Sequence, residues 1–132
     1  MTIKRLIPFM MILIGLCACT QGIPVVSSST ASSGIEGYVI AGPTCPGPVR
    51  IGDTGCQDQP YQAVITILDM TNNQVTQFQT DEMGYFRIFL KSGTYIIHPE
   101  PGIPLPIAND QTIVVNDGNY TQISINYDTG IR

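Results

Sequence analysis

Few residues in this chain of 132 belong to the types that carry out chemistry, and the single histidine is one of them. Catalysis at His98 would need a nucleophile or a second proton-transfer group that converges on it, and no motif in the sequence supplies one. The acidic residues expected in turns lack the D-x-D-x-D spacing of a calcium loop; they are Asp69, Asp81, Glu82 and Asp128. We therefore predict no catalytic residue, no metal site and no cofactor.

A segment typical of an export signal occupies the N-terminus. Lys4 and Arg5 form a short positive region, and an apolar run follows over residues 6–16. This run is shorter than the roughly 20 residues that a membrane-spanning helix needs. The segment therefore predicts export rather than a transmembrane helix.

The signal ends in Leu-Cys-Ala-Cys at residues 16–19. This sequence resembles the bacterial lipobox, in which the last cysteine is diacylated and becomes the mature N-terminus. We predict a lipoprotein signal peptide over residues 1–18, a lipid on Cys19, and an exported protein anchored to the cell membrane or the outer membrane of a bacterium. An ordinary signal peptide, cleaved near Ala18 or further on, is the alternative.

The two remaining cysteines, Cys45 and Cys56, lie in segment 42–60, which is too rich in glycine and proline for a strand or a helix. In an exported chain such a pair most often forms a disulfide. Closing so short a loop would stabilise the fold by roughly 2–3 kcal/mol. A metal site or a redox pair is the alternative, which the lack of C-x-x-C spacing and the single histidine disfavour.

Charge limits the partners of the mature chain. Loss of the signal peptide leaves four basic residues against ten acidic ones, so the net charge falls from −4 to −6. An acidic surface repels phosphate groups, which excludes nucleic acid as a partner and leaves membrane contact to the lipid. Residues 19–33 include a run of serine and threonine that is typical of a flexible tether, with a reach of roughly 20 Å.

Residues 34–132 show short runs of β-branched and aromatic residues between turn residues, and no sustained helical period. The sequence predicts one all-β domain, an antiparallel seven-stranded β-sandwich of Greek-key type, with a closed barrel as the alternative. Alternation predicts that Ile123, Ile125 and Tyr127 point into the core. Turns are expected at Asn72-Asn73, which tolerates a positive φ, and at residues 81–84, which end in Gly84. The expected strands are 35–41, 63–70, 74–80, 85–90, 93–98, 111–116 and 121–127.

Two sequence motifs resemble a known family. Residues 80–86 and 90–95 are similar to the T-D-x-x-G-x-F and L-x-x-G-x-Y signature of carboxypeptidase regulatory-like domains, and residues 34–39 match their G-x-x-G-x-V opening. These domains are transthyretin-like (prealbumin-like) β-sandwiches. The resemblance implies the fold and leaves the activity open, because such modules accompany many unrelated partners.

Activities of related sandwiches are not expected here. Hydroxyisourate hydrolases use several histidines and a C-terminal Y-R-G-S motif, and this chain has neither. The isopeptide bond of collagen-adhesin B-type repeats needs a lysine on the first strand, an asparagine on the last and an acid between them. Asn126 and Glu36 are suitably placed, but the only mature lysine, Lys91, stands beside a turn glycine, so we expect no isopeptide bond.

Segment 99–110 has four prolines around Ile103, Leu105 and Ile107 and is too long for a tight turn. A rigid loop with apolar residues at its tip is suited to binding a partner. It is also suited to covering the open end of the sandwich, and the residues alone leave both roles open.

The leading hypothesis is a non-enzymatic, lipid-anchored module of the cell envelope that acts in adhesion or protein interaction. The alternative is a carbohydrate-binding module, whose exposed aromatic platform would come from Tyr38, Tyr61, Tyr85 and Tyr120. An enzyme or a protease inhibitor is less favoured, and the inhibitor would need segment 42–60 or 99–110 as its reactive loop. The sequence predicts a protein or a glycan as partner and does not identify it.

Overall fold

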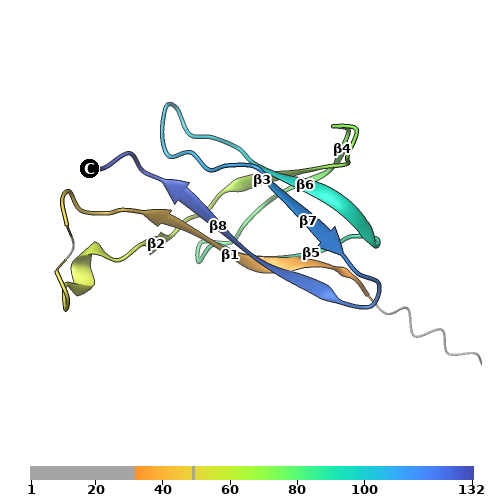
Figure 1. Ribbon diagram of the computed structural model, residues 1–132, viewed down its shortest axis with the longest axis horizontal. Coiled ribbons are helices and arrows are strands. Elements are labelled where there is room, and N and C mark those ends of the chain that lie inside the picture. The colour runs from red at the N-terminus through yellow and green to blue at the C-terminus, as the bar shows by residue number, and fades with distance from the viewer. Residues whose placement is uncertain (1–31, 49) are drawn as a thin grey trace, which may run out of the picture.

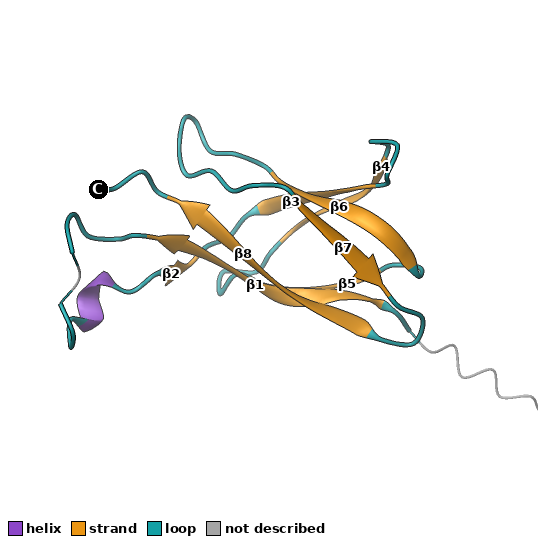
Figure 2. Cartoon of the chain, viewed as in Figure 1, coloured by secondary structure: helices purple, strands orange, loops and turns teal. Residues whose placement is uncertain are grey.

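The structure, a computed structural model, describes residues 32–48 and 50–132, which form two facing β-sheets (Figures 1 and 2). One short 3-10 helix interrupts the strands. The elements in chain order are β1 (Gly34–Gly42), η1 (Thr54–Cys56), β2 (Gln59–Pro60), β3 (Val64–Leu68), β4 (Gln74–Gln79), β5 (Tyr85–Phe89), β6 (Gly93–Pro99), β7 (Gln111–Val115) and β8 (Tyr120–Asp128).

Sheet A is built around β1. On one side of β1, β5 pairs antiparallel with its first half and β2 pairs antiparallel near its end. On the other side β8 runs parallel along the whole strand, from Gly34 opposite Tyr120 to Gly42 opposite Asp128. Sheet B has the order β4-β3-β6-β7, and all of its pairs are antiparallel.

The core lies between the two sheets and follows the alternation of the strands. Phe86 and Leu90 of the β5 region are buried, and so are Ile125 and Tyr127 of β8. Outward positions on the same strands are more exposed, as in Phe89. The largest fully buried side chains are Tyr127, Ile35, Ile65, Ile67, Ile97 and Ile125. Their burial supplies the main driving force for folding.

Turn residues stand where their backbone geometry requires them. Asn72 adopts a φ of 60° between β3 and β4, a conformation that asparagine tolerates better than most residues. Gly84 has a φ of 73°, and a side chain at this position would collide with the carbonyl oxygen of Val39. Both predicted turns are therefore present.

The prediction of an all-β sandwich is confirmed, with two differences. Residues 32–48 and 50–132 contain eight strands, because Gln59–Pro60 forms a two-residue strand that is too short to show a period. The prediction of a wholly antiparallel arrangement is wrong at one pairing, since β8 runs parallel to β1. The side chain of Ser33, just before β1, is buried and donates a hydrogen bond to the carbonyl oxygen of Leu90.

Candidate functional site

The two ends of the sandwich differ in how the chain reverses direction (Figure 1). At one end, here called the turn end, lie Gly34 and the tight turns 69–73, 90–93 and 116–119. At the opposite end, here called the loop end, lie the longer segments 43–58 and 100–110 together with residues 129–132. Both loops proposed from the sequence as binding segments thus share one end.

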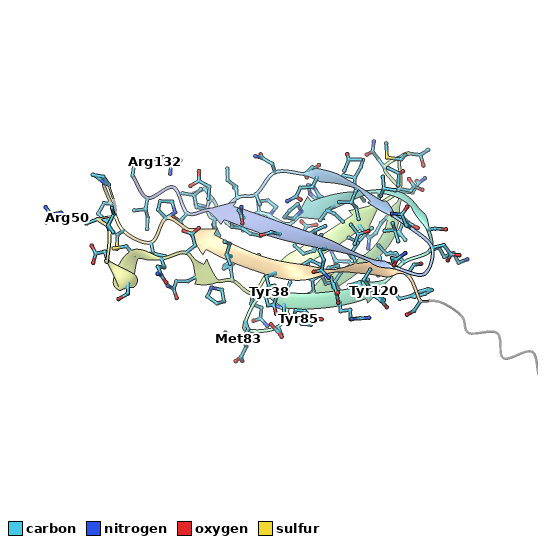
Figure 3. All side chains as sticks on the ribbon, turned by 60° about the horizontal axis from the view of Figure 1, so that its bottom comes forward. Tyr38, Arg50, Met83, Tyr85, Tyr120 and Arg132 are labelled. Carbon is cyan, nitrogen blue, oxygen red and sulfur yellow. A yellow bond between two sulfur atoms is a disulfide. The ribbon has the colours of Figure 1, made fainter. Side chains whose placement is uncertain are left out.

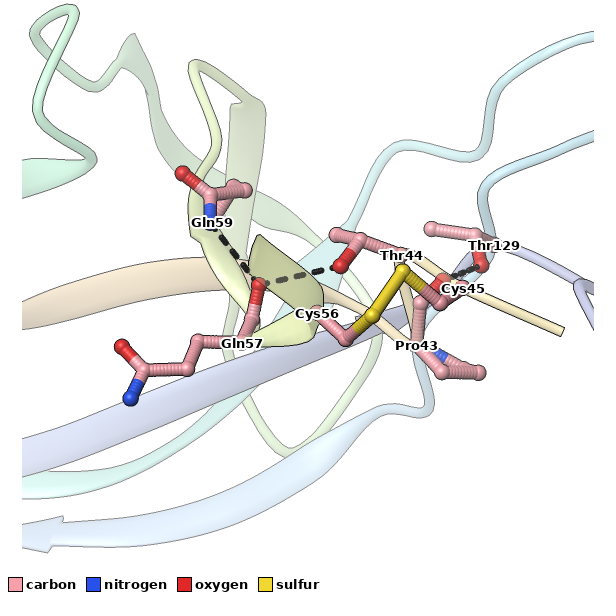
Figure 4. Close-up of a disulfide and its surroundings, with 7 residues drawn as sticks. All are labelled: Pro43, Thr44, Cys45, Cys56, Gln57, Gln59 and Thr129. Carbon is pink, nitrogen blue, oxygen red and sulfur yellow. Dashed lines mark hydrogen bonds between the residues drawn. A yellow bond between two sulfur atoms is a disulfide. The ribbon is translucent and has the colours of Figure 1, made fainter. Parts of the chain in front are cut away.

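A disulfide joins Cys45 and Cys56 at the loop end, with Cα atoms 5.2 Å apart (Figure 4). The Thr44 hydroxyl donates a hydrogen bond to the carbonyl oxygen of Gln57 on the far side of the disulfide. The segment is therefore closed by one covalent bond and one cross-loop hydrogen bond. It carries a fully exposed side chain, Ile51 at 108% relative exposure, which the sequence analysis had not singled out.

The proline-rich segment is fixed at its base and exposed at its tip. Ile107 and Asp128 exchange two backbone hydrogen bonds, with N···O distances of 3.0 and 2.7 Å. Ile103 at the tip is 100% exposed. Leu105 is 43% exposed and lies so close to Gly130 that a side chain at position 130 would collide with Leu105. The expected residues Ile103, Leu105 and Ile107 therefore divide between an exposed tip and an anchored base.

Two titratable groups stand at the end of β8: Tyr127 binds this loop, and the Asp128 carboxylate binds the residues that follow β8. The Tyr127 hydroxyl donates to the carbonyl oxygen of Glu100 at 2.9 Å, and burial, with Tyr61 and Glu100 nearby, raises the pKa of Tyr127 to about 12. Hydrogen bonds from Arg132 and from the backbone N–H of Gly130 lower the pKa of Asp128 to about 2.

His98 lies near the end of β6, and its Nδ1 is 2.7 Å from the Oδ1 atom of Asp110. Both side chains are substantially exposed. Beside them the Thr66 hydroxyl donates to the Glu100 carboxylate at 2.7 Å. Within residues 32–48 and 50–132, no group of three or more His, Cys, Asp or Glu side chains is placed to hold a metal ion.

The three residues considered for an isopeptide bond lie on the surface and apart. Glu36 is paired with Arg87 on the outer side of sheet A, with 2.7 Å between Nη1 and Oε2. Asn126 pairs in register with Ile40 of β1. Ile40 lies six positions, or about 20 Å of strand, from Gly34, which marks the end of β1 near Lys91. Lys91 is exposed in the turn that follows β5, at the Gly34 end.

Three of the four tyrosines proposed as a platform share one surface. Tyr38, Tyr85 and Tyr120 come from β1, β5 and β8 and lie on the outer side of sheet A (Figure 3). Tyr61 instead packs on Tyr127, with ring centroids 4.8 Å apart, and belongs to the core periphery. The sequence named these tyrosines one by one, and only the strand pairing brings three of them together.

The proposed lipidation residue Cys19, the signal peptide 1–18 and most of the tether 19–33 lie outside the described residues. In the part of the chain that the structure describes, no helix is long and apolar enough to cross a membrane.

Comparison with known proteins shows similarity in fold alone. No family model matches the chain, and no curated protein matches it in sequence. A minor pilin of Streptococcus agalactiae aligns with a TM-score of 0.54 and 14% identity, over 74% of this chain and 45% of the pilin. The shaft pilin SpaA of Lactobacillus rhamnosus aligns with a TM-score of 0.52 and 10% identity, over 74% of this chain and 50% of the pilin. The chain thus shares a β-sandwich with these pilins and spans half of their length or less.

Proposed function

We propose that this protein is a non-enzymatic, lipid-anchored β-sandwich of the bacterial cell envelope, and that its loop end contacts a protein partner. Cys19 carries the lipid in this proposal, and the residues up to Ser33 connect the lipid to the folded domain. The role is that of an adhesion or accessory module rather than of an enzyme.

The observation that carries the proposal is the position of Gly34. The folded domain is entered at the turn end, where the Gly34 N–H donates to the carbonyl oxygen of Asn119 at 3.2 Å. β1 then runs directly to the loop end (Figure 1). An anchor on the N-terminal side of Gly34 therefore leaves the loop end directed away from the membrane, where a partner can reach it.

The chemistry of the loop end suits a protein partner. Ile51 and Ile103 expose their full side chains from two separate segments. The first segment is closed by a disulfide, and the second is fixed at its base to β8. Apolar side chains on such a pre-organised backbone can bind with little further loss of conformational entropy. The fold shared with two pilins is consistent with a surface location and supports the proposal only in that general sense.

Detergent partitioning of cells that express the full chain tests the anchor. The unaltered protein should enter the detergent phase, and Cys19→Ala should move it to the aqueous phase. Cys17→Ala should leave the partitioning unchanged, since residue 17 is expected to be removed with the signal. A Cys19→Ala protein that still enters the detergent phase would contradict lipidation at this residue.

A photo-crosslinking amino acid tests the orientation. Placed at position 103 in the loop end, it should give a discrete crosslinked product on intact cells. Placed at Asp117 in the turn end, it should give none of the same mass. Identical products from both positions would mean that the loop end is not the contact surface.

A further inference from the structure

The outer side of sheet A carries an ordered set of aromatic and polar side chains, which we call the aromatic face. β1 is central, and the register places Tyr85 beside Tyr38 and Arg87 beside Glu36. On the other side the register places Gln122 beside Glu36. The residues of the aromatic face are Glu36, Tyr38, Tyr85, Arg87, Tyr120 and Gln122, and its three tyrosines are labelled in Figure 3.

Two aromatic groups flank a row of three polar side chains, Arg87, Glu36 and Gln122, which we call the polar row. The rings of Tyr38 and Tyr85 are tilted by 52° with centroids 5.2 Å apart, and Tyr38 is 57% exposed. At the other side of the polar row, Tyr120 lies in the row of Gly34, four positions before Tyr38 along β1. Four residues of strand correspond to about 13 Å, so the polar row lies midway between the two aromatic groups.

The polar row is held in place by its own contacts. Glu36 accepts hydrogen bonds from Arg87, at 2.7 Å, and from the Gln122 amide. The Arg87 guanidinium also lies over the Tyr120 ring, with Cζ 3.8 Å from the centroid. Because these contacts already fix the side chains of the polar row, they lose little further conformational freedom when a ligand binds.

We infer that the aromatic face is a binding site for a neutral carbohydrate chain. A sugar ring has an apolar side of C–H groups, which stacks on aromatic rings, and a rim of hydroxyl groups that both donate and accept hydrogen bonds. The exposed Tyr38 ring and its neighbour Tyr85 match the apolar side of one sugar. The planar Arg87 guanidinium, which lies over the Tyr120 ring, offers a second flat surface to the next sugar. The carboxylate, amide and guanidinium of the polar row match the hydroxyl groups between them.

Charge argues for a neutral ligand. Arg87 and Glu36 neutralise each other, so the aromatic face offers no free cation to a phosphate or a sulfate group. The net charge of −6 expected for the mature chain also repels polyanions. A purely apolar partner is disfavoured as well, because it would bury the Glu36–Arg87 pair without compensating hydrogen bonds.

Sedimentation with insoluble polysaccharides tests the inference, using the full mature chain in detergent micelles. The probes are chitin, cellulose and β-1,3-glucan, with decaproline on beads as a peptide probe and heparin beads as an anionic probe. We expect retention on at least one neutral polysaccharide, and little change in it between 0.05 and about 0.5 M salt, because no ion pair with the ligand is involved.

Variants then locate the site. Tyr38→Ala and Tyr120→Ala should each weaken binding by about tenfold, and Tyr38→Phe should retain most of it because the ring remains. Val114→Ala is the matched control, since Val114 is 55% exposed but lies on β7 in sheet B. A cooperative thermal transition establishes that each variant is folded. If Tyr120→Ala fails this check, Tyr38→Ala, at the more exposed position, decides.

Three results would overturn the inference: no retention on any neutral polysaccharide, retention that the Tyr38→Ala protein shares, or stronger retention on decaproline or heparin. The aromatic face is separate from the loop end and from Cys19. Failure of glycan binding therefore leaves the proposed function standing. A failed crosslink at position 103 contradicts the proposed contact at the loop end and does not bear on the aromatic face, which sedimentation decides.

Discussion

The turn end and the loop end close the same sandwich by different means. At the turn end each reversal is held by groups a few positions apart, as where the Asp69 carboxylate accepts from the N–H groups of Thr71 and Asn73 at 2.8 and 2.9 Å. At the loop end the contacts join distant segments, as where the Thr129 hydroxyl donates to the carbonyl oxygen of Pro43, 86 positions earlier. The turns of the turn end are determined locally, whereas the long segments of the loop end are held by contacts with distant parts of the chain.

This difference explains where the disulfide stands. A tight turn closes few residues and supplies its own hydrogen bonds, so a cross-link would add little there. Segment 43–58 is longer, and its described residues form a single turn of 3-10 helix, so ordering it costs more conformational entropy. A covalent bond between Cys45 and Cys56 offsets part of that cost by restricting the unfolded chain.

Removal of the disulfide should produce the largest effect. Replacing both Cys45 and Cys56 with serine should lower the free energy of unfolding by roughly 2–3 kcal/mol, the entropy of closing a loop of this size. Chemical denaturation measures the loss. Hydrogen exchange should locate the greatest loss of amide protection in segment 43–58, with the turns 69–73 and 116–119 little changed.

The control is the unaltered protein under reducing conditions, whose free energy of unfolding should equal that of the doubly substituted protein. Intact mass under non-reducing conditions should show Cys45 and Cys56 linked within one chain. Equal loss of protection at both ends would contradict the view that the disulfide acts mainly on the loop end.

Tyr127→Phe should have the next largest effect, about 1 kcal/mol, because it removes the hydrogen bond to Glu100 that ties segment 100–110 to β8. The pKa of Tyr127 is raised to about 12 in the folded protein. The stability that this group contributes is therefore present below pH 10 and is lost as the pH rises from 10 to 12.

Thermal melting across this pH range checks the prediction for Tyr127. The Tyr127→Phe protein should be less stable at pH 8 and should lose less stability than the unaltered protein above pH 10. A similar alkaline loss in both proteins would assign the pH dependence to other groups.

The same contrast between local and distant contacts separates what could be predicted from what could not. Asn72 and Gly84 were identified as turn residues because their backbone preferences are local properties. All seven expected strands are present, since alternation is also local. The parallel pairing of β8 with β1 depends on residues some 86 positions apart and has no local signal.

The candidate sites follow this division. Tyr38, Tyr85 and Tyr120 could be named from the sequence, whereas their grouping with Glu36 and Arg87 required the register of three strands. The sequence likewise did not show which residues of segment 99–110 form its exposed tip and which form its fixed base. The two backbone hydrogen bonds that fix the base come from β8.

Two aspartates, one at each end of the sandwich, allow the pH dependence of stability to be compared between the ends. Asp69 at the turn end and Asp128 at the loop end both have a pKa of about 2. Their contribution to stability is present above pH 4 and is lost as the pH falls towards 2. Asp69→Asn and Asp128→Asn should each reduce the slope of stability against pH in this range, as measured by denaturation between pH 2 and 6.

Salt should distinguish the two aspartates. The low pKa of Asp69 rests mainly on hydrogen bonds from Thr71 and Asn73, whereas that of Asp128 rests first on Arg132. Raising the salt concentration to about 1 M should therefore raise the pKa of Asp128 more than that of Asp69, because salt screens an exposed ion pair. Carboxyl chemical shifts followed by NMR give both values, and equal responses would remove the distinction.

The smallest effect on stability is expected at the tip of the loop end, where function is proposed to concentrate. Ile103→Ser should change the free energy of unfolding by less than about 0.5 kcal/mol, since the side chain is fully exposed. Leu105→Ala should cost about 1 kcal/mol, because Leu105 packs against Gly130.

If the tip binds a partner, Ile103→Ser should abolish the crosslink formed from a probe at Ile51 while the melting temperature stays unchanged. A lowered melting temperature in the Ile103→Ser protein would instead mean that the whole segment, tip included, serves to cover the sandwich.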